Sequence, residues 1–168
     1  MSAYAYSHGL ETEIAEDRVR SAQDVRDWVA AILAAGAGRA DAVLMLAARR
    51  AQQPLDELCA LAEALAGSRE RLEETRAQGR ALAQTLAGMG QGDGVARPYP
   101  VALGVATRAL DLPDQMVAAL YLQAVAGALV SVAVRFVPLG QVDGQRILAD
   151  LHPVITQVAQ VAVTMAPD

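Results

Sequence analysis

The chain has 168 residues, a length typical of one domain, and its core must be largely aliphatic because it has only one Trp, one Phe and four Tyr. All 14 basic residues are Arg, and the net charge of −5 argues against binding to a phosphate backbone. The single cysteine, Cys59, excludes an intramolecular disulfide framework, and residues 1–6 lack signal-peptide features, so we expect a cytoplasmic protein.

The first half of the chain predicts four helices separated by short breaks. Ser21 followed by Asp24 resembles a capping box, and apolar residues at helical spacing continue to a stop at Gly36 and Gly38. The fourth helix carries many charges and few apolar residues, which is typical of a solvated surface with side-chain pairs at i, i+3 and i, i+4. The expected ranges are about 21–35, 39–52, 55–65 and 68–86.

The second half begins with a loop, about residues 88–100, whose four Gly and two Pro predict mobility. Pro113 then suits the first turn of a long apolar helix. In the last segment we expect Asp143 to act as a cap and Pro153 to kink or divide the helix. The helices expected before this segment cover about 101–109 and 113–136.

These elements predict an all-α fold, a single-domain helical bundle around a central apolar helix, extending over residues 1–168. The central helix carries no charge between Asp114 and Arg135, and about 20 apolar residues suffice to span a membrane. However, a helix buried inside a bundle has the same composition, and no second span is evident. We therefore expect a buried helix and no membrane anchor.

No catalytic motif is present in the sequence: it has no Walker-type loop, no nucleophile elbow and no Cys/His spacing for zinc. His8 and Glu11 would share one face of a helix, but two ligands make at most a transient nickel contact and no stable metal site. Cys59 lies among leucines and is expected to be a small buried hydrophobic residue.

Three further features stand out. Asp41 near the start of the second helix would be favoured there by the helix dipole. Gly79 costs a helix interior about 1 kcal/mol relative to Ala, so we expect it to allow close backbone packing. Residues 140–145 form a dense group of hydrogen-bonding side chains, which we interpret as a capped polar turn.

Five stretches together resemble the urease accessory protein UreF family. Each stretch alone is weakly specific, but their order and spacing extend over nearly the whole chain. The most specific is Val-Pro-Leu-Gly-Gln-Val-Asp-Gly-Gln at the end of the apolar helix. The five stretches are residues 6–11, 36–41, 68–82, 99–104 and 137–145.

The resemblance implies an all-helical, usually homodimeric protein that is not an enzyme. Family members bind the accessory protein UreD, also called UreH, recruit the GTPase UreG and help to deliver nickel to apo-urease. The resemblance thus implies no cofactor of its own, because nickel and GTP are handled by partners. Members of the family begin earlier and end later than this chain, so it is expected to be shortened at both termini.

By position, the resemblance implies that a set of matching residues forms the partner surface or a polar passage for the metal. The set consists of Tyr6, His8, Glu11, Asp41, Ser68, Arg69, Glu70, Arg76, Gly79, Gln141, Asp143 and Gln145.

Three other readings remain open from the residues alone. The first is a generic helical-bundle interaction module unrelated to nickel. The second is a helical enzyme whose metal-dependent site uses Glu70, Glu73 and Glu74 with Asp143, which requires these carboxylates to face inward. The third is a membrane-anchored bundle.

Overall fold

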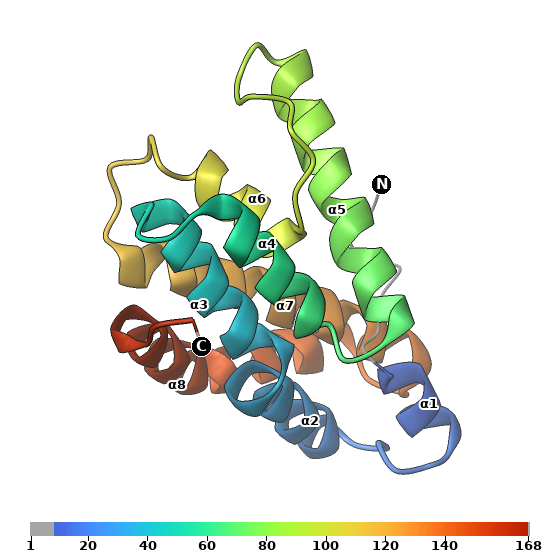
Figure 1. Ribbon diagram of the computed structural model, residues 1–168. Helices are drawn as coiled ribbons and strands as arrows, with labels where there is room; N and C mark the ends of the chain where they lie inside the picture. The colour runs from blue at the N-terminus through green and yellow to red at the C-terminus, as the bar shows by residue number, and fades with distance from the viewer. Residues whose placement is uncertain (1–8, 168) are drawn as a thin grey trace. The chain divides into compact units, whose positions relative to one another are not determined.

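The computed structural model describes residues 9–167, and all regular secondary structure in that range is α-helical (Figure 1). The all-α, single-domain fold class predicted from the sequence is confirmed, whereas its extension over residues 1–168 stays a prediction. The helices are α1 Leu10–Ala15, α2 Ala22–Ala35, α3 Ala37–Arg50, α4 Leu55–Ala64, α5 Arg69–Gly88, α6 Tyr99–Ala106, α7 Asp114–Phe136 and α8 Gln141–Thr164.

The chain forms two compact units, each built from segments that are distant in sequence. The first unit comprises Met1–Arg39 and Ala119–Val161, and the second comprises Ala40–Ala118 and Ala162–Asp168. Helices α3, α7 and α8 therefore contribute residues to both units.

The start of α2 agrees with the prediction. Ser21 Oγ accepts a hydrogen bond from the Asp24 N–H at 3.2 Å, and the Ser21 N–H donates to Asp24 Oδ2 at 3.0 Å, which completes a capping box. Gly36 ends this helix as expected, but Gly38 lies inside α3 and does not act as a stop. A Cβ on Gly38 would lie 2.8 Å from Leu33 Cα, so glycine here lets α3 begin close against α2.

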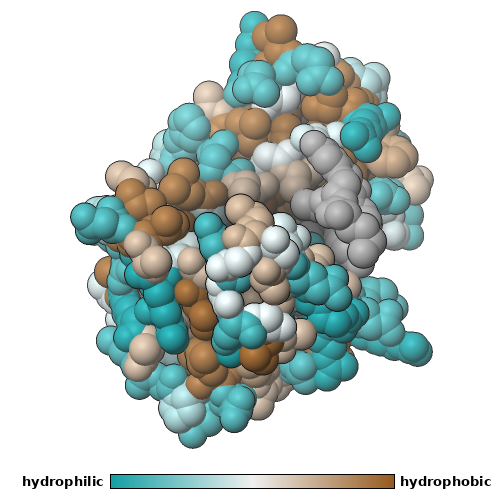
Figure 2. Space-filling model, turned by 90° about the horizontal axis from the view of Figure 1, so that it is seen from above, coloured by the Kyte–Doolittle hydropathy of each residue, from teal (hydrophilic) through white to brown (hydrophobic). Residues whose placement is uncertain are grey.

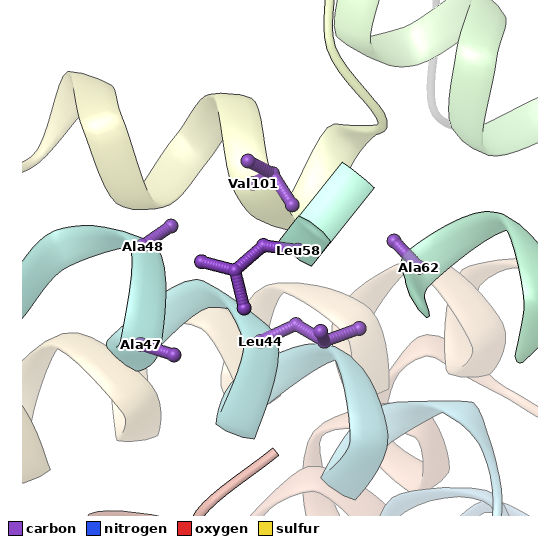
Figure 3. Packing of buried hydrophobic residues seen from close by; sticks show 6 residues of the cluster. All are labelled: Leu44, Ala47, Ala48, Leu58, Ala62 and Val101. Atoms are coloured by element: carbon purple, nitrogen blue, oxygen red, sulfur yellow. The ribbon is translucent and has the colours of Figure 1, made fainter. Parts of the chain in front are cut away.

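The core of the second unit lies between α3, α4 and α6. Figure 3 shows how Leu58 of α4 lies among side chains of α3 and α6. Cys59 packs against this cluster and is half-buried, which agrees with its predicted role as a small hydrophobic residue, and burial raises the pKa of its thiol. The buried members of the cluster are Leu44, Ala47, Ala48, Leu58, Ala62 and Val101.

Helix α7 begins directly after Pro113, as predicted, but only half of its most apolar window is buried. Leu120 and Phe136 of this helix remain more than half exposed. Figure 2 likewise shows hydrophobic patches at the surface, bordered by hydrophilic residues. The expectation that α7 is buried all round is therefore wrong.

Three helical stretches among the described residues are long and apolar enough to cross a membrane, judged by length and composition. The prediction that only one such stretch exists is therefore wrong, because amphipathic helices rich in Ala, Leu and Val also reach this hydropathy. The stretches are Ala22–Arg50, Asp114–Phe136 and Gln141–Thr164.

Helix α8 continues through Pro153, so the expected division of this segment does not occur. Proline lacks the N–H that would bond to the fourth residue before it. Leu151 and Ile155 are nevertheless buried on either side of it, and this packing compensates for the lost hydrogen bond. Residues 89–98 form the expected connection without helix or strand, and their mobility stays a prediction.

Candidate functional site

The first matching stretch, residues 6–11, lies only partly within the described residues. Tyr6 and His8 lie outside the described residues, and Glu11 is exposed on α1. A transient nickel contact at His8 and Glu11 therefore stays a prediction.

The motif residues at the start of α5 are mostly exposed. Ser68 is the N-cap, and its Oγ accepts a hydrogen bond from the Arg71 N–H at 3.1 Å. Arg69 has 85% of its side chain exposed and pairs with Glu73 one turn later, at 2.8 Å. Glu70 is also exposed. This end of α5 thus presents charged side chains to its surroundings.

Arg76 makes a contact that its position in α5 does not reveal. Its Nε and Nη2 donate to both carboxylate oxygens of Glu63 on α4, at 2.8 and 2.6 Å. Side-chain pairs within the helix were predicted for this segment, and Arg69–Glu73 is one, but Arg76 contacts α4 instead, because its planar guanidinium matches the Glu63 carboxylate in a bidentate arrangement. The hydrogen bond from Arg76 lowers the pKa of Glu63 below its ordinary value.

A buried polar cluster joins α3 to α5. Asp41 of α3 and Glu74 of α5 are both buried, and Arg71 pairs with each carboxylate, with Glu74 at 2.9 Å. Gln78 donates a second hydrogen bond to Glu74 at 3.0 Å. Asp41 lies in the second turn of α3, and its partner is this arginine, so the helix-dipole interpretation of Asp41 is replaced by a tertiary ion pair.

Sequence reasoning missed Arg71, Glu74 and Thr75 as parts of this arrangement. Thr75 Oγ1 accepts a hydrogen bond from the Tyr99 N–H at 3.1 Å, which satisfies a backbone donor at the start of α6. Burial raises the pKa of the Tyr99 phenol, and the negative charge of Asp41 raises it further. Helix α5 therefore binds the first residue of α6 as well as α3.

Gly79 has the close contact predicted for it. A Cβ at this position would lie 1.7 Å from the Arg97 carbonyl oxygen, so only glycine allows the chain before α6 to pass this near. Figure 1 shows that segment returning beside α5. Gly104, which was not singled out from the sequence, plays the same role where α6 meets α3: its Cβ would lie 2.3 Å from the Met45 carbonyl oxygen.

The predicted polar turn is largely the first turn of α8. Gln141 to Gln145 are helical, and only Gly140 remains outside as the residue before the helix. Asp143 Oδ2 accepts a hydrogen bond from the Gly140 N–H at 3.1 Å, so its predicted capping role is confirmed. Gln141 and Gln145 are exposed on the same turn.

The hypothesis of a metal site built from carboxylates requires these side chains to face inward, and most of them do not. Glu70 and Glu73 are exposed, and only Glu74 faces inward, where Arg71 already neutralises it. Within residues 9–167 no three His, Cys, Asp or Glu side chains are grouped so that they could hold a metal ion.

A second set of arginines ties the two ends of the second unit together. Arg49 and Arg50 of α3 pair with Asp114 at 2.9 and 2.6 Å, and Arg50 also donates to the Val163 carbonyl of α8 at 3.1 Å. Burial works against the charge of Asp114, but the hydrogen bonds from the two arginines outweigh it and lower the pKa. This cluster is a structural junction that the sequence did not reveal.

Comparison with known proteins gives a consistent result. A model of the family described as UreF matches residues 19–152. The urease accessory protein UreF of Jannaschia sp. strain CCS1 is 60% identical over 168 residues, which is 100% of this chain and 76% of the relative. That of Cereibacter sphaeroides strain KD131 is 54% identical over 157 residues, covering 94% of this chain and 74% of the relative. That of Bradyrhizobium sp. strain BTAi1 is 36% identical over 181 residues, covering 100% and 75%.

Proposed function

The chain belongs to the urease accessory protein UreF family, and from that membership we propose that it is a non-catalytic adaptor in the maturation of urease. In this role it binds UreD (UreH) and regulates the GTPase UreG while nickel is inserted into apo-urease. Nickel and GTP are handled by the partners, so the chain needs no cofactor of its own. It works in the cytoplasm as a homodimer, without binding nucleic acid or a membrane.

The observation that carries this proposal is similarity to UreF proteins over all 168 residues of this chain, at 60% identity to the relative from Jannaschia sp.. The placement of the motif residues supports it. Arg69, Glu70 and Arg76 are exposed on α5, and Gln141 and Gln145 are exposed on α8. Exposed polar side chains on well-formed helices suit the contacts of a protein partner, in which charge selects the partner and steers its approach.

The buried cluster supports a second part of the proposal. Asp41 and Glu74 bring two carboxylates into the interior, and the guanidinium of Arg71 pairs with both. A buried group of this kind is expensive to desolvate, and removing one partner leaves an uncompensated buried charge, so its geometry is strongly constrained. We assign it the role of holding α5 in register with α3, so that the exposed charges of α5 keep a fixed spacing for the partner.

The test is complementation in a urease-producing host that lacks its own UreF-type protein. With this chain supplied, we expect urease activity and the nickel content of purified urease to be restored together. Restored nickel delivery by the Jannaschia relative but not by this chain would contradict the proposal. It would favour the alternative, a helical interaction module unrelated to nickel.

A matched pair of variants separates partner contact from folding. Gln141→Ala combined with Gln145→Ala changes only exposed side chains of α8, so helical content should persist while activation of urease falls. The control is Gln157→Ala combined with Gln160→Ala, which alters two exposed glutamines of the same helix outside the matching stretches. Equal activation of urease by both double variants would mean that the first turn of α8 is not part of the partner surface.

A further inference from the structure

Helix α7 carries two stripes of uncharged residues on opposite sides, and only one of them is buried within the chain. Leu122, Ala126 and Leu129 follow one another at spacings of four and three residues, which keeps them on one face of a helix, and all three are buried. A second stripe with the same spacing begins two residues earlier, about half a turn around the helix. This second stripe, the outer face of α7, consists of Leu120, Ala124, Gly127 and Ser131.

The outer face is exposed and carries no charge. Leu120 is 57% exposed, and Ala124 and Ser131 are exposed as well. An exposed helix face normally carries charges, as α5 does with Arg and Glu side chains throughout its first turns. In α7 there is no charged residue from Gln115 to Val134. Exposed apolar side chains without charges among them are typical of the centre of a protein interface.

Gly127 is a glycine inside a helix for which the chain itself gives no reason. Glycine costs a helix interior about 1 kcal/mol relative to alanine. At Gly79 and Gly104 this cost has a cause, because an added Cβ would lie 1.7 and 2.3 Å from a carbonyl oxygen of another segment. A Cβ on Gly127 would meet nothing within 4 Å among the described residues. The same argument that predicted the close approach at Gly79 therefore points to a backbone outside this chain at Gly127.

The distribution of charge favours a second copy of this chain as the partner on the outer face. With a net charge of −5 on each chain, two copies repel each other over most of their surfaces. An uncharged face set against itself avoids that repulsion, and a two-fold contact uses the same patch on both chains. A partner selected by charge would find no charge to recognise here. All four residues lie in the first compact unit, so the face is complete within that unit.

We propose that two copies of the chain associate through the outer face of α7, with α7 packed against α7 of the partner and Gly127 at the point where the two helices cross. Small side chains at Ala124 and Ser131 let the helix backbones approach, and Leu120 is buried against the partner. The inference rests on the homodimer in the proposed function and adds the surface that forms it.

Light scattering after size-exclusion chromatography tests the proposal, with the full chain loaded over a roughly hundredfold range of concentration. The wild type should reach twice its mass of 17.6 kDa. Leu120→Glu should remain a monomer with unchanged helical content, because it sets two like charges against each other in the dimer but lies exposed in the single chain. The control is Leu65→Glu, which changes a leucine of similar exposure after α4 and should still dimerise. A wild-type monomer at every concentration, or a dimer of Leu120→Glu, would overturn the proposal.

Gly127→Ala separates association from folding. Its methyl group should raise the dissociation constant of the dimer at least roughly tenfold, because it holds the two backbones apart. In the monomeric Leu120→Glu background the same change should raise the temperature of unfolding, since its Cβ meets no neighbour and alanine favours the helix. The matched control is Gly88→Ala, whose Cβ also meets nothing within 4 Å and which should leave the dissociation constant unchanged. An unchanged dissociation constant for Gly127→Ala would overturn the crossing point.

Two other occupants of the outer face are outcomes of the same design. If Leu120→Glu lost retention on affinity-tagged UreD but still dimerised, the face would belong to UreD and the proposal would be overturned. Flotation of wild-type monomers with phosphatidylcholine vesicles, lost in Leu120→Glu, would assign the face to a membrane and also overturn it. A dimer that depends on Leu120 in a chain that fails to restore urease activity would support the interface and contradict the proposed function.

Discussion

Residues 40–50 of α3 and the whole of α5 lie in the same compact unit, yet different kinds of side chain hold them in place. Helix α3 packs Leu44, Ala47 and Ala48 against α4 and α6, while α5 turns Glu74, Thr75 and Gly79 toward its neighbours. The first arrangement tolerates many apolar substitutions of similar volume, whereas the second depends on specific pairs and on one close backbone approach. The comparison predicts that substitutions at the contacts of α5 are tolerated less readily than apolar exchanges in α3, because specific contacts restrict the sequence more than packing does.

The largest loss of stability is expected when a side chain of the α3–α4–α6 core is truncated. Leu58 is fully buried, so Leu58→Ala should lower the free energy of unfolding by about 2–5 kcal/mol through lost burial and the cavity left behind. Denaturant unfolding followed by circular dichroism measures it. Leu65→Ala is the control, because Leu65 is half exposed at the end of the same helix, and it should cost less than about 1 kcal/mol. Equal losses would mean that the α3–α4–α6 core does not dominate this unit.

A smaller loss of stability is expected where Gly79 of α5 lies against the backbone at Arg97. Gly79→Ala places a Cβ 1.7 Å from the Arg97 carbonyl oxygen, which forces the backbone apart and should cost about 1–3 kcal/mol, with Gly79→Leu costing more. Gly88→Ala is the control, because nothing lies within 4 Å of its Cβ and alanine favours the helix. Thermal unfolding of the pair should therefore shift in opposite directions, and a stabilising Gly79→Ala would refute the close contact.

The hydrogen bond between the Tyr99 N–H and Thr75 Oγ1 should contribute measurably to stability. Thr75→Val keeps the shape of the side chain but leaves the Tyr99 N–H without its acceptor, so stability should fall by about 1 kcal/mol. Thr85→Val provides the comparison, since the Thr85 hydroxyl bonds only to Ala81 of its own helix and is exposed; its effect should stay within about 0.5 kcal/mol. If Thr75→Val left the free energy of unfolding unchanged, this hydrogen bond would not contribute to holding α5 against α6.

The smallest effect concerns the connection after α5, where Asp93 pairs with Arg97 at 2.6 Å. The hydrogen bond from Arg97 lowers the pKa of Asp93 from 3.8 to about 2, so the pair contributes fully above pH 3.8 and is lost as pH falls toward 2. Because Asp93 is half exposed, we expect only a few tenths of a kcal/mol. Titration of the Asp93 carboxyl by NMR should show a midpoint near 2. The midpoint should be higher in Arg97→Met, in which the hydrogen bond from the Val95 N–H still favours the carboxylate. The same midpoint in both proteins would contradict the pairing.

Local features were predictable from the sequence because they depend on neighbouring residues. The capping box at Ser21 and Asp24, the start of α7 after Pro113 and the cap formed by Asp143 all follow from short-range hydrogen bonding or from the fixed backbone angle of proline. The close contact of Gly79 was also inferred, because glycine is costly inside a helix unless a neighbouring chain needs the space.

Tertiary pairings could not be predicted in the same way. Arg71 lies 30 residues from Asp41, and nothing local distinguishes it from Arg69 or Arg76, which are largely exposed. The continuation of α8 through Pro153 was missed for a related reason, since burial of apolar residues on either side outweighs one lost hydrogen bond. For Arg71 the deciding contact comes from a part of the chain that is distant in sequence, and for Pro153 the deciding factor is burial, which the local sequence does not specify.

The central claim, that this chain serves urease maturation through protein partners, is tested most directly by co-purification with affinity-tagged UreD. The 168-residue chain should be retained and elute with UreD, as should the Jannaschia relative run under the same conditions. Retention of the relative while this chain passes through unbound would contradict the account.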